Sequence, residues 1–287
     1  MCYNTATNRN STGSHPSSMH STFLLGGDLR VNRFGYGAMR LCAQPGNFGR
    51  YPDWEAGKRL LRRAVELGIN FFDTAHAYGP AVNEELIGDA LAPYASGVVI
   101  ATKGGVEKTA PDKVFPDGRP ENLRRRCEES LKLLRLERID LYQLHRPDPQ
   151  VPLAESVGTL AELRAAGKIR HVGLSNVSIA QIEEARSIVP IASVQNRYNL
   201  AERGDDPVVD YCTAHDIAYL PWGPLAAKPF AREAPLAATR GALAWLLRRA
   251  PNIIVIPGTT SIEHLEENIA AAQQPLSEEE FATLSTH

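Results

Sequence analysis

The stretch INFFDTAHAY, residues 69–78, runs from apolar residues into polar ones, as a strand does when it ends at a functional site. Phe71 and Phe72 adjoin each other without a polar residue between them, which is typical of a strand covered on both faces. In a barrel of strand–helix units, the loops that follow the strands converge on one mouth and carry the chemistry. The stretch therefore predicts a buried parallel strand that brings Asp73 and Tyr78 to such a mouth.

Further segments read as strands of the same kind. They are rich in β-branched or aromatic residues, and helical patterns separate them. They cover 34–39, 98–102, 139–145, 170–175, 191–196, 217–222 and 253–258. Alternating strand and helix repeated about eight times predicts an α/β fold, a single (β/α)8 TIM barrel. A doubly wound open sheet is the alternative, but the sequence lacks the GxGxxG turn expected after its first strand.

Turn and capping signals mark the remaining boundaries. Gly26 and Gly27 lie between two apolar runs and predict an N-terminal β-hairpin at the bottom of the barrel. Asp53 predicts the N-cap of one helix, and Thr260 with Glu263 matches the capping-box pattern of another. Residues 1–21 are rich in Ser, Thr and Asn and predict a disordered lead-in, so the barrel domain is expected over 22–287.

The composition argues against several classes of protein. The 31 Lys and Arg residues against 33 Asp and Glu leave no basic excess for nucleic acid. No apolar stretch approaches the roughly 20 residues of a membrane-spanning helix. The four cysteines lie far apart without a CxxC pair, so we expect neither a zinc site nor disulfides. We expect a cytoplasmic protein without a metal, a monomer or weak homo-oligomer.

Polar residues end three of the predicted strands: Asp73 and Tyr78 in FFDTAHAYG, Lys103 in VVIATKGG, and His145 in DLYQLHRPD. This set, in this order, resembles the catalytic tetrad of the aldo-keto reductases, in particular a bacterial branch near the pyridoxal reductases. The resemblance covers residues 22 to 287. It implies that Tyr78 donates a proton, that Lys103 lowers the pKa of this phenol, that Asp73 holds the lysine, and that His145 orients a carbonyl.

Three later segments, GLSN (173–176), VQNRYN (194–199) and PWGPL (221–225), follow further strands. The resemblance implies that Ser175, Asn176 and Gln195 bind the carboxamide of a nicotinamide, and that Trp222 stacks on the ring. Residues expected at the cofactor after this tryptophan are Gly223, Leu225 and Lys228.

The segment IPGTTSIEHLEEN, residues 256–268, places a glycine and three hydroxyl residues at the start of a helix, which favours an anion. Many members of the family have Lys at the position of Gly258 and Arg at that of His264 to bind the 2′-phosphate of NADP. This chain has neither, yet the turn still suggests a phosphate, so we expect NADPH, with NADH as the alternative. The expected cofactor residues here are Gly258, Thr259, Thr260, Ser261, His264, Glu267 and Asn268.

The resemblance implies an NADPH-dependent oxidoreductase that reduces the carbonyl of a small polar metabolite to an alcohol. A nucleotide-sensing or regulatory member of the same fold, with little turnover, is the alternative. A metal-dependent hydrolase has little support, because no HxH pair appears. Between Pro224 and Leu243 the chain is several residues shorter than the family usually runs, which predicts a missing helix near the pyrophosphate.

Overall fold

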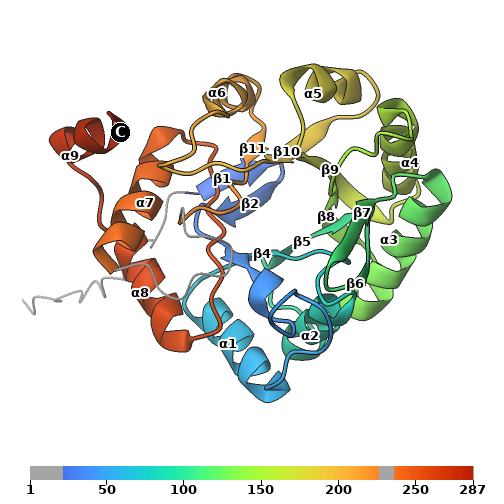
Figure 1. Cartoon of the computed structure of the whole chain (residues 1–287), viewed down its shortest axis with the longest axis horizontal. Helices are drawn as coiled ribbons and strands as arrows, with labels where there is room; N and C mark the ends of the chain where they lie inside the picture. The colour runs from blue at the N-terminus through green and yellow to red at the C-terminus, as the bar shows by residue number, and fades with distance from the viewer. Residues whose placement is uncertain (1–21, 226–235, 287) are drawn as a thin grey trace, which may run out of the picture.

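A computed structural model describes residues 22–225 and 236–286. Within them, seven parallel strands form one sheet in the order β11-β10-β9-β8-β5-β4-β3. Figure 1 shows this sheet curled, with helices around its outside. The strands are β3 (Tyr36–Gly37), β4 (Phe71–Asp73), β5 (Val99–Gly104), β8 (Ile139–Leu144), β9 (Ile169–Ser175), β10 (Ile191–Gln195) and β11 (Ala218–Tyr219).

The remaining expected strand, over 253–258, forms only isolated bridges, but these bridges join both edges of the sheet. Ile253 pairs with Tyr219 of β11, and Val255 pairs with Phe34 just before β3, both in parallel. Pro251 and Pro257 flank the segment, and proline lacks the backbone donor that a longer ladder needs. Residues 253–255 therefore connect the two edges of the sheet, although they do not form a regular strand.

Helices follow most strands, and their first turns test the capping predictions. Asp53 caps α1, since its Oδ1 accepts from Ala56 N at 2.9 Å, as predicted. The prediction for α8 was wrong by one residue, because Ser261 is the N-cap and accepts from His264 N at 3.2 Å. The helices are α1 (Trp54–Glu66), α2 (Val82–Leu91), α3 (Pro120–Leu134), α4 (Leu153–Ala165), α5 (Ile179–Arg186), α6 (Asp206–Ala214), α7 (Leu236–Arg249), α8 (Ile262–Ala272) and α9 (Glu278–Ser285), with a 3₁₀ turn, η1 (Ala38–Arg40). In the described part of the chain, none of them has the length and apolar character to cross a bilayer.

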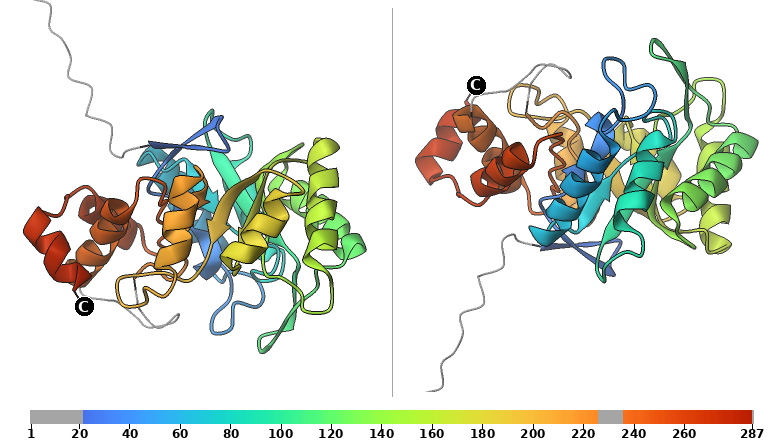
Figure 2. Two further views of the ribbon diagram at one scale, coloured as in Figure 1. Left: turned by 90° about the horizontal axis from the view of Figure 1, so that it is seen from above. Right: turned by 90° about the horizontal axis from the view of Figure 1, so that it is seen from below.

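Two antiparallel hairpins lie at opposite ends of the curled sheet (Figure 2). The predicted hairpin, β1 (Thr22–Leu25) with β2 (Leu29–Asn32), is present and packs Leu25, Leu29 and Val31 into the interior of the sheet. The other, β6 (Val106–Ala110) with β7 (Lys113–Pro116), is not among the elements predicted from the sequence.

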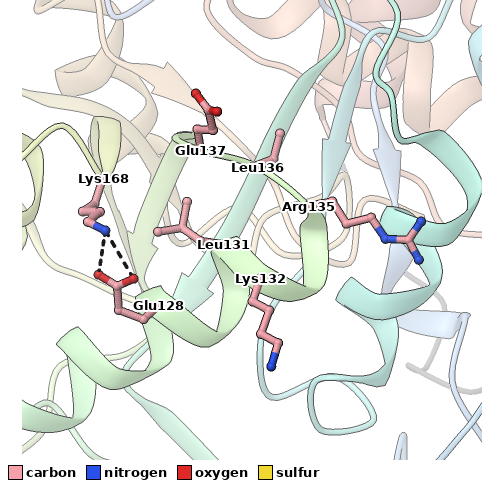
Figure 3. Close-up of a pocket in the computed structure, with 7 residues that line it drawn as sticks. All are labelled: Glu128, Leu131, Lys132, Arg135, Leu136, Glu137 and Lys168. Atoms are coloured by element: carbon pink, nitrogen blue, oxygen red, sulfur yellow. Dashed lines mark hydrogen bonds and ion pairs between the residues drawn. The ribbon is translucent and has the colours of Figure 1, made fainter.

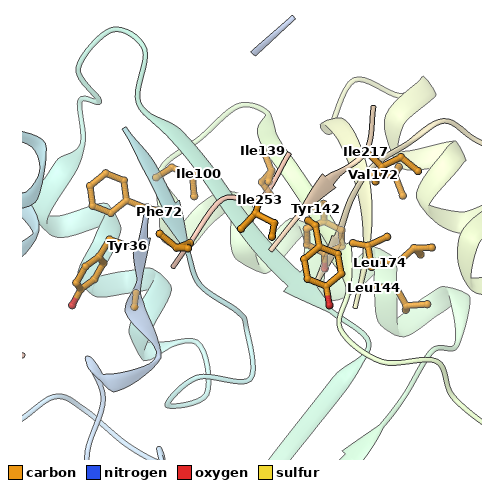
Figure 4. Close-up of a cluster of buried hydrophobic side chains, with 14 of the residues drawn as sticks. Tyr36, Phe72, Ile100, Ile139, Tyr142, Leu144, Val172, Leu174, Ile217 and Ile253 are labelled. Carbon is orange, nitrogen blue, oxygen red and sulfur yellow. The ribbon is translucent and has the colours of Figure 1, made fainter. Parts of the chain in front are cut away.

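The strands separate an inner from an outer core. Phe71 belongs to the inner cluster with Ala101 and Leu141, whereas Phe72 belongs to the outer cluster that packs against the helices. Figure 4 shows part of this outer cluster. Successive side chains of a strand point to opposite faces, so the residue two positions after an inner one is also inside. This alternation places Asp73, Lys103 and Gln143 above the apolar inner layer, at the carboxyl ends of β4, β5 and β8.

Candidate functional site

The ends of β4, β5 and β8 bring the four predicted residues together. Lys103 is fully buried, and its Nζ donates to both carboxylate oxygens of Asp73, at 2.9 and 2.8 Å, and to Thr74 O at 2.8 Å. The same Nζ lies 5.2 Å from the centroid of the Tyr78 ring. That ring meets the His145 ring edge-on, with centroids 5.9 Å apart.

Burial and the ion pair set the charges of these groups. Burial lowers the pKa of Lys103, but its interactions with Asp73 and Tyr78 together outweigh burial, and the net pKa is raised, so the lysine stays cationic. Burial raises the pKa of Tyr78 above its usual 10, although Lys103 pulls it down. The predicted direction of the lysine's effect is therefore right, but burial is the larger influence and the phenol stays protonated at neutral pH.

His145 is held neutral. Burial, with the nearby charges of Lys103 and Arg146, holds the pKa of this imidazole well below 6.5. Its backbone N donates to Gly104 O at 2.8 Å, and its backbone O accepts from Asn176 Nδ2 at 3.1 Å. Within the described residues, its buried Nδ1 has no hydrogen-bond partner.

Asp73 accepts hydrogen bonds from two amide side chains besides the lysine. Gln195 Nε2 donates to its Oδ1 at 2.9 Å, and Gln143 Nε2 approaches the same oxygen at 3.3 Å. Gln195 was expected only at the cofactor, and Gln143 was missed altogether. A signal for Gln143 was present, since a glutamine inside an apolar strand, two residues before His145, shares the face of that histidine.

The residues expected at a nicotinamide carboxamide adjoin this cluster. Asn176 has a positive φ of 58° and donates from Nδ2 to Ser175 Oγ at 3.0 Å. Its Oδ1 accepts from Trp222 Nε1 at 3.2 Å, so the indole is tied to the end of β9. The Arg197 guanidinium lies 5.3 Å from the centroid of the Trp222 ring. Gly223 and Leu225 follow the tryptophan, and Lys228 lies outside the described residues.

The hydroxyl-rich turn before α8 is fixed to β3. Tyr36 OH donates to Thr259 O at 2.6 Å. A Cβ on Gly258 would lie only 2.6 Å from Gly37 O, so this position has no room for the lysine of other family members. The side chain of Arg40 passes the same place, with Cγ 3.9 Å from that Cβ position. Arg40 is not among the residues predicted from the sequence, and it makes no hydrogen bond or ion pair with the described residues.

The first turns of α8 carry the other expected cofactor residues. Ser261 caps the helix, Thr260 is exposed just before it, and His264 and Glu267 are half-buried. Asn268 is buried. Glu266, one of several acidic residues in the first turns of α8, pairs with Arg63 of α1 at 2.7 Å. That pairing neutralises one of the acidic groups near the turn.

A surface pocket lies at the other end of the strands (Figure 3). Its lining comes from the end of α3, the segment before β8, and Lys168, which pairs with Glu128 at 3.1 Å. Because it adjoins the start of β8 whereas His145 follows the end, the pocket takes no part in the site. No group of His, Cys, Asp or Glu suited to a metal occurs within 22–225 and 236–286.

Known proteins share both the sequence and the fold. The Aldo/keto reductase family model matches residues 33–235 and 227–287. Pyridoxine 4-dehydrogenase of Escherichia coli is 42% identical over 281 residues, which cover 92% of this chain and 97% of that protein.

Solved structures agree with this assignment. A glycerol dehydrogenase of Gluconobacter oxydans matches with a TM-score of 0.83 at 28% identity, over 93% of this chain and 94% of that one. An aldo-keto reductase of Klebsiella pneumoniae, in complex with NADPH, matches with a TM-score of 0.75 at 26% identity, over the same shares of the two chains. The chain therefore belongs to the aldo/keto reductase family and is an NAD(P)H-dependent oxidoreductase.

Proposed function

We propose that this chain uses NADPH to reduce the carbonyl of a small polar aldehyde or ketone to an alcohol, within a closed (β/α)8 barrel. The observation that carries the proposal is the buried Lys103–Asp73 ion pair, with Nζ 5.2 Å from the Tyr78 ring and the His145 ring edge-on beside it. When bound, NADPH supplies the hydride for the carbonyl carbon.

Tyr78 is the proton donor for the carbonyl oxygen, where negative charge develops. Its raised pKa keeps the phenol protonated at neutral pH. Loss of the proton leaves a phenolate, which the adjacent Lys103 cation stabilises. Asp73 keeps the ammonium in position, because its two oxygens both accept from Nζ.

His145 orients the carbonyl. Its lowered pKa makes the ring neutral, so one nitrogen carries hydrogen and the other accepts. The buried Nδ1 that finds no partner among the described residues supports a role in which a ligand completes the hydrogen bonding of this ring.

The residues around the hydroxyl-rich turn fit NADPH. The Ser261 side chain caps His264 N at the start of α8, and the helix dipole favours an anion at this end of the helix. Arg40, whose Cγ lies 3.9 Å from the Cβ position of Gly258, is the cation that we assign to the phosphate in place of the excluded lysine. At the other end of the cofactor, Ser175 and Asn176 are the expected partners of the carboxamide.

The relatives and the residues beside the site support the proposed substrate class. Because the chain is 42% identical to a pyridoxine 4-dehydrogenase, an aldehyde such as pyridoxal is the first compound to test. Arg146 is exposed next to His145, and its charge is close enough to lower the pKa of that imidazole, so a cation near the site also favours a polar substrate.

Replacement of Tyr78 by phenylalanine tests the proposal. We expect pyridoxal reduction, followed by NADPH absorbance, to fall at least about 100-fold, because general acid catalysis contributes this much or more. The dissociation constant for NADPH, from tryptophan quenching, should change less than about threefold, since the phenol does not hold the cofactor. Tyr211→Phe on α6 is the matched control and should behave as wild type.

The other outcomes separate the alternatives. Wild-type rates in Tyr78→Phe would overturn the assignment of the proton donor. A wild-type protein that binds NADPH but turns over none of a panel of aldehydes would point instead to the nucleotide-sensing role.

A further inference from the structure

We propose that Gln143 is a positioning residue that holds Asp73, and through it Lys103, beneath Tyr78, and that Ser193 orients Gln143 for this task. The inference rests on the proposed function, because it concerns the proton donor of that reaction. Neither Gln143 nor Ser193 belongs to the proposed catalytic tetrad.

The hydrogen bonds fix which way the Gln143 amide points. Gln143 is fully buried; its Oε1 accepts from Ser193 Oγ at 3.3 Å, and its Nε2 faces Asp73 Oδ1 at 3.3 Å. A carboxylate can only accept, whereas a hydroxyl can donate. The NH2 group must therefore face Asp73, and the serine holds the amide in this orientation.

The contact between Gln143 and Ser193 crosses an intervening strand. Gly173 of β9 is in register with Gln143 of β8 on one side and with Ser193 of β10 on the other. A Cβ on Gly173 would lie 2.2 Å from Ser193 Oγ and 2.8 Å from Gln143 Cγ. Only glycine at this position lets the two side chains meet.

Gln143 matters because the charge of Asp73 is buried. This charge raises the pKa of Tyr78, whereas the lysine lowers it. An amide donor on Asp73 disperses part of the carboxylate charge without adding a cation. Without Gln143, Asp73 would bind Lys103 more strongly, and less of the lysine's charge would stabilise the phenolate.

The first test compares Gln143→Leu with wild type. We expect kcat for pyridoxal to fall about fivefold, the rate equivalent of one modest hydrogen bond. The dissociation constant for NADPH should stay within about twofold. Ser193→Ala should lower kcat less and should have no further effect in the Gln143→Leu background, because it acts through the same amide. Tyr142→Phe, on the outer face of β8, is the control and should keep wild-type kcat.

The second test, Gln143→Glu, separates positioning from simple packing. A buried carboxyl beside Asp73 keeps a proton at lower pH and can then donate to Asp73 as the amide does. We expect nearly wild-type kcat at about pH 6 and a loss of at least about tenfold by about pH 9, as the second carboxyl ionises. Wild type and Gln143→Leu should lack this step.

Two results would overturn the inference. One is a kcat for Gln143→Leu within about twofold of wild type. The other is a Gln143→Glu variant whose pH profile parallels that of wild type, or that is equally slow at every pH, as expected for a packing defect alone. Failure of the proposed function looks different, because the wild-type protein would then reduce no aldehyde with NADPH.

Discussion

Replacing Lys103 by methionine removes the cation from a buried ion pair. The side chain of Lys103 is fully buried, and only 4% of that of Asp73 is exposed, so water screens neither charge. After the change, the amides of Gln143 and Gln195 are the side-chain donors to Asp73 that remain among the described residues. Removing one partner of such a pair costs about 3–5 kcal/mol, because the other charge stays buried. We expect Lys103→Met to lower the free energy of unfolding by this amount.

A second change should restore most of the loss. Asp73→Asn in the Lys103→Met background removes the remaining charge, and neutral replacement of both partners is often close to neutral in stability. Urea unfolding followed by tryptophan fluorescence measures both variants. Lys168→Met is the control, because the pair of Lys168 with Glu128 is exposed and should contribute less than about 1 kcal/mol.

Two outcomes would refute this reasoning. A Lys103→Met variant within about 1 kcal/mol of wild type would mean that Asp73 carries no uncompensated buried charge once the lysine is gone. A double variant no more stable than Lys103→Met would mean that the loss comes from packing instead of charge.

Three further measurements test other groups. Because the pKa of His145 is held well below 6.5, the rate of reduction should show no inflection near that pH; an inflection that His145→Asn removes would contradict this. Burial raises the pKa of Glu84 to about 7 from 4.5, so the folded protein keeps a proton that the unfolded chain loses. The free energy of unfolding of the wild type should therefore decrease as the pH rises from 4.5 to 7. Glu84→Gln removes this slope and, by urea unfolding, should exceed wild type by about 3 kcal/mol at pH 8 and match it near pH 5. Arg40→Gln should raise the dissociation constant for NADPH at least about tenfold and that for NADH less than about twofold, and equal changes for both would remove the phosphate role of Arg40.

The strands of the main sheet, and the places of Asp73, Lys103 and His145 at strand ends, could be predicted from the sequence because each depends on local pattern. Phe71 and Phe72 show a strand buried on both faces, and Asp73 comes at its end. The β6–β7 hairpin was missed for the opposite reason. Its strands pair only with each other outside the main sheet, so Val106–Ala110 is largely polar and has no pattern of a buried strand.

Which of two neighbouring residues plays a role also could not be predicted from the sequence. Thr260 and Ser261 can both cap a helix, and the observed cap is decided by the turn at Thr259, whose Oγ1 accepts from Ser261 N at 3.1 Å. Arg40 reaches Gly258 from a segment more than 200 residues away in the chain. The cytoplasmic location and the oligomeric state stay predictions. So do the disordered lead-in over 1–21 and the missing helix near the pyrophosphate, since residues 1–21 and 226–235 lie outside the described residues.

The position of Gln195 beside Asp73 depends on an irregularity that no period-two pattern contains. The register between β10 and β9 shifts between Ile191 and Ser193, which inserts Ala192 as an extra residue. Ala192 belongs to the inner cluster, and Ser193 directly after it also faces inward to Gln143. Strict alternation from Ala192 would turn Gln195 outward, towards the helices. The bulge reverses this phase, so that both Ser193 and Gln195 reach the network around Asp73.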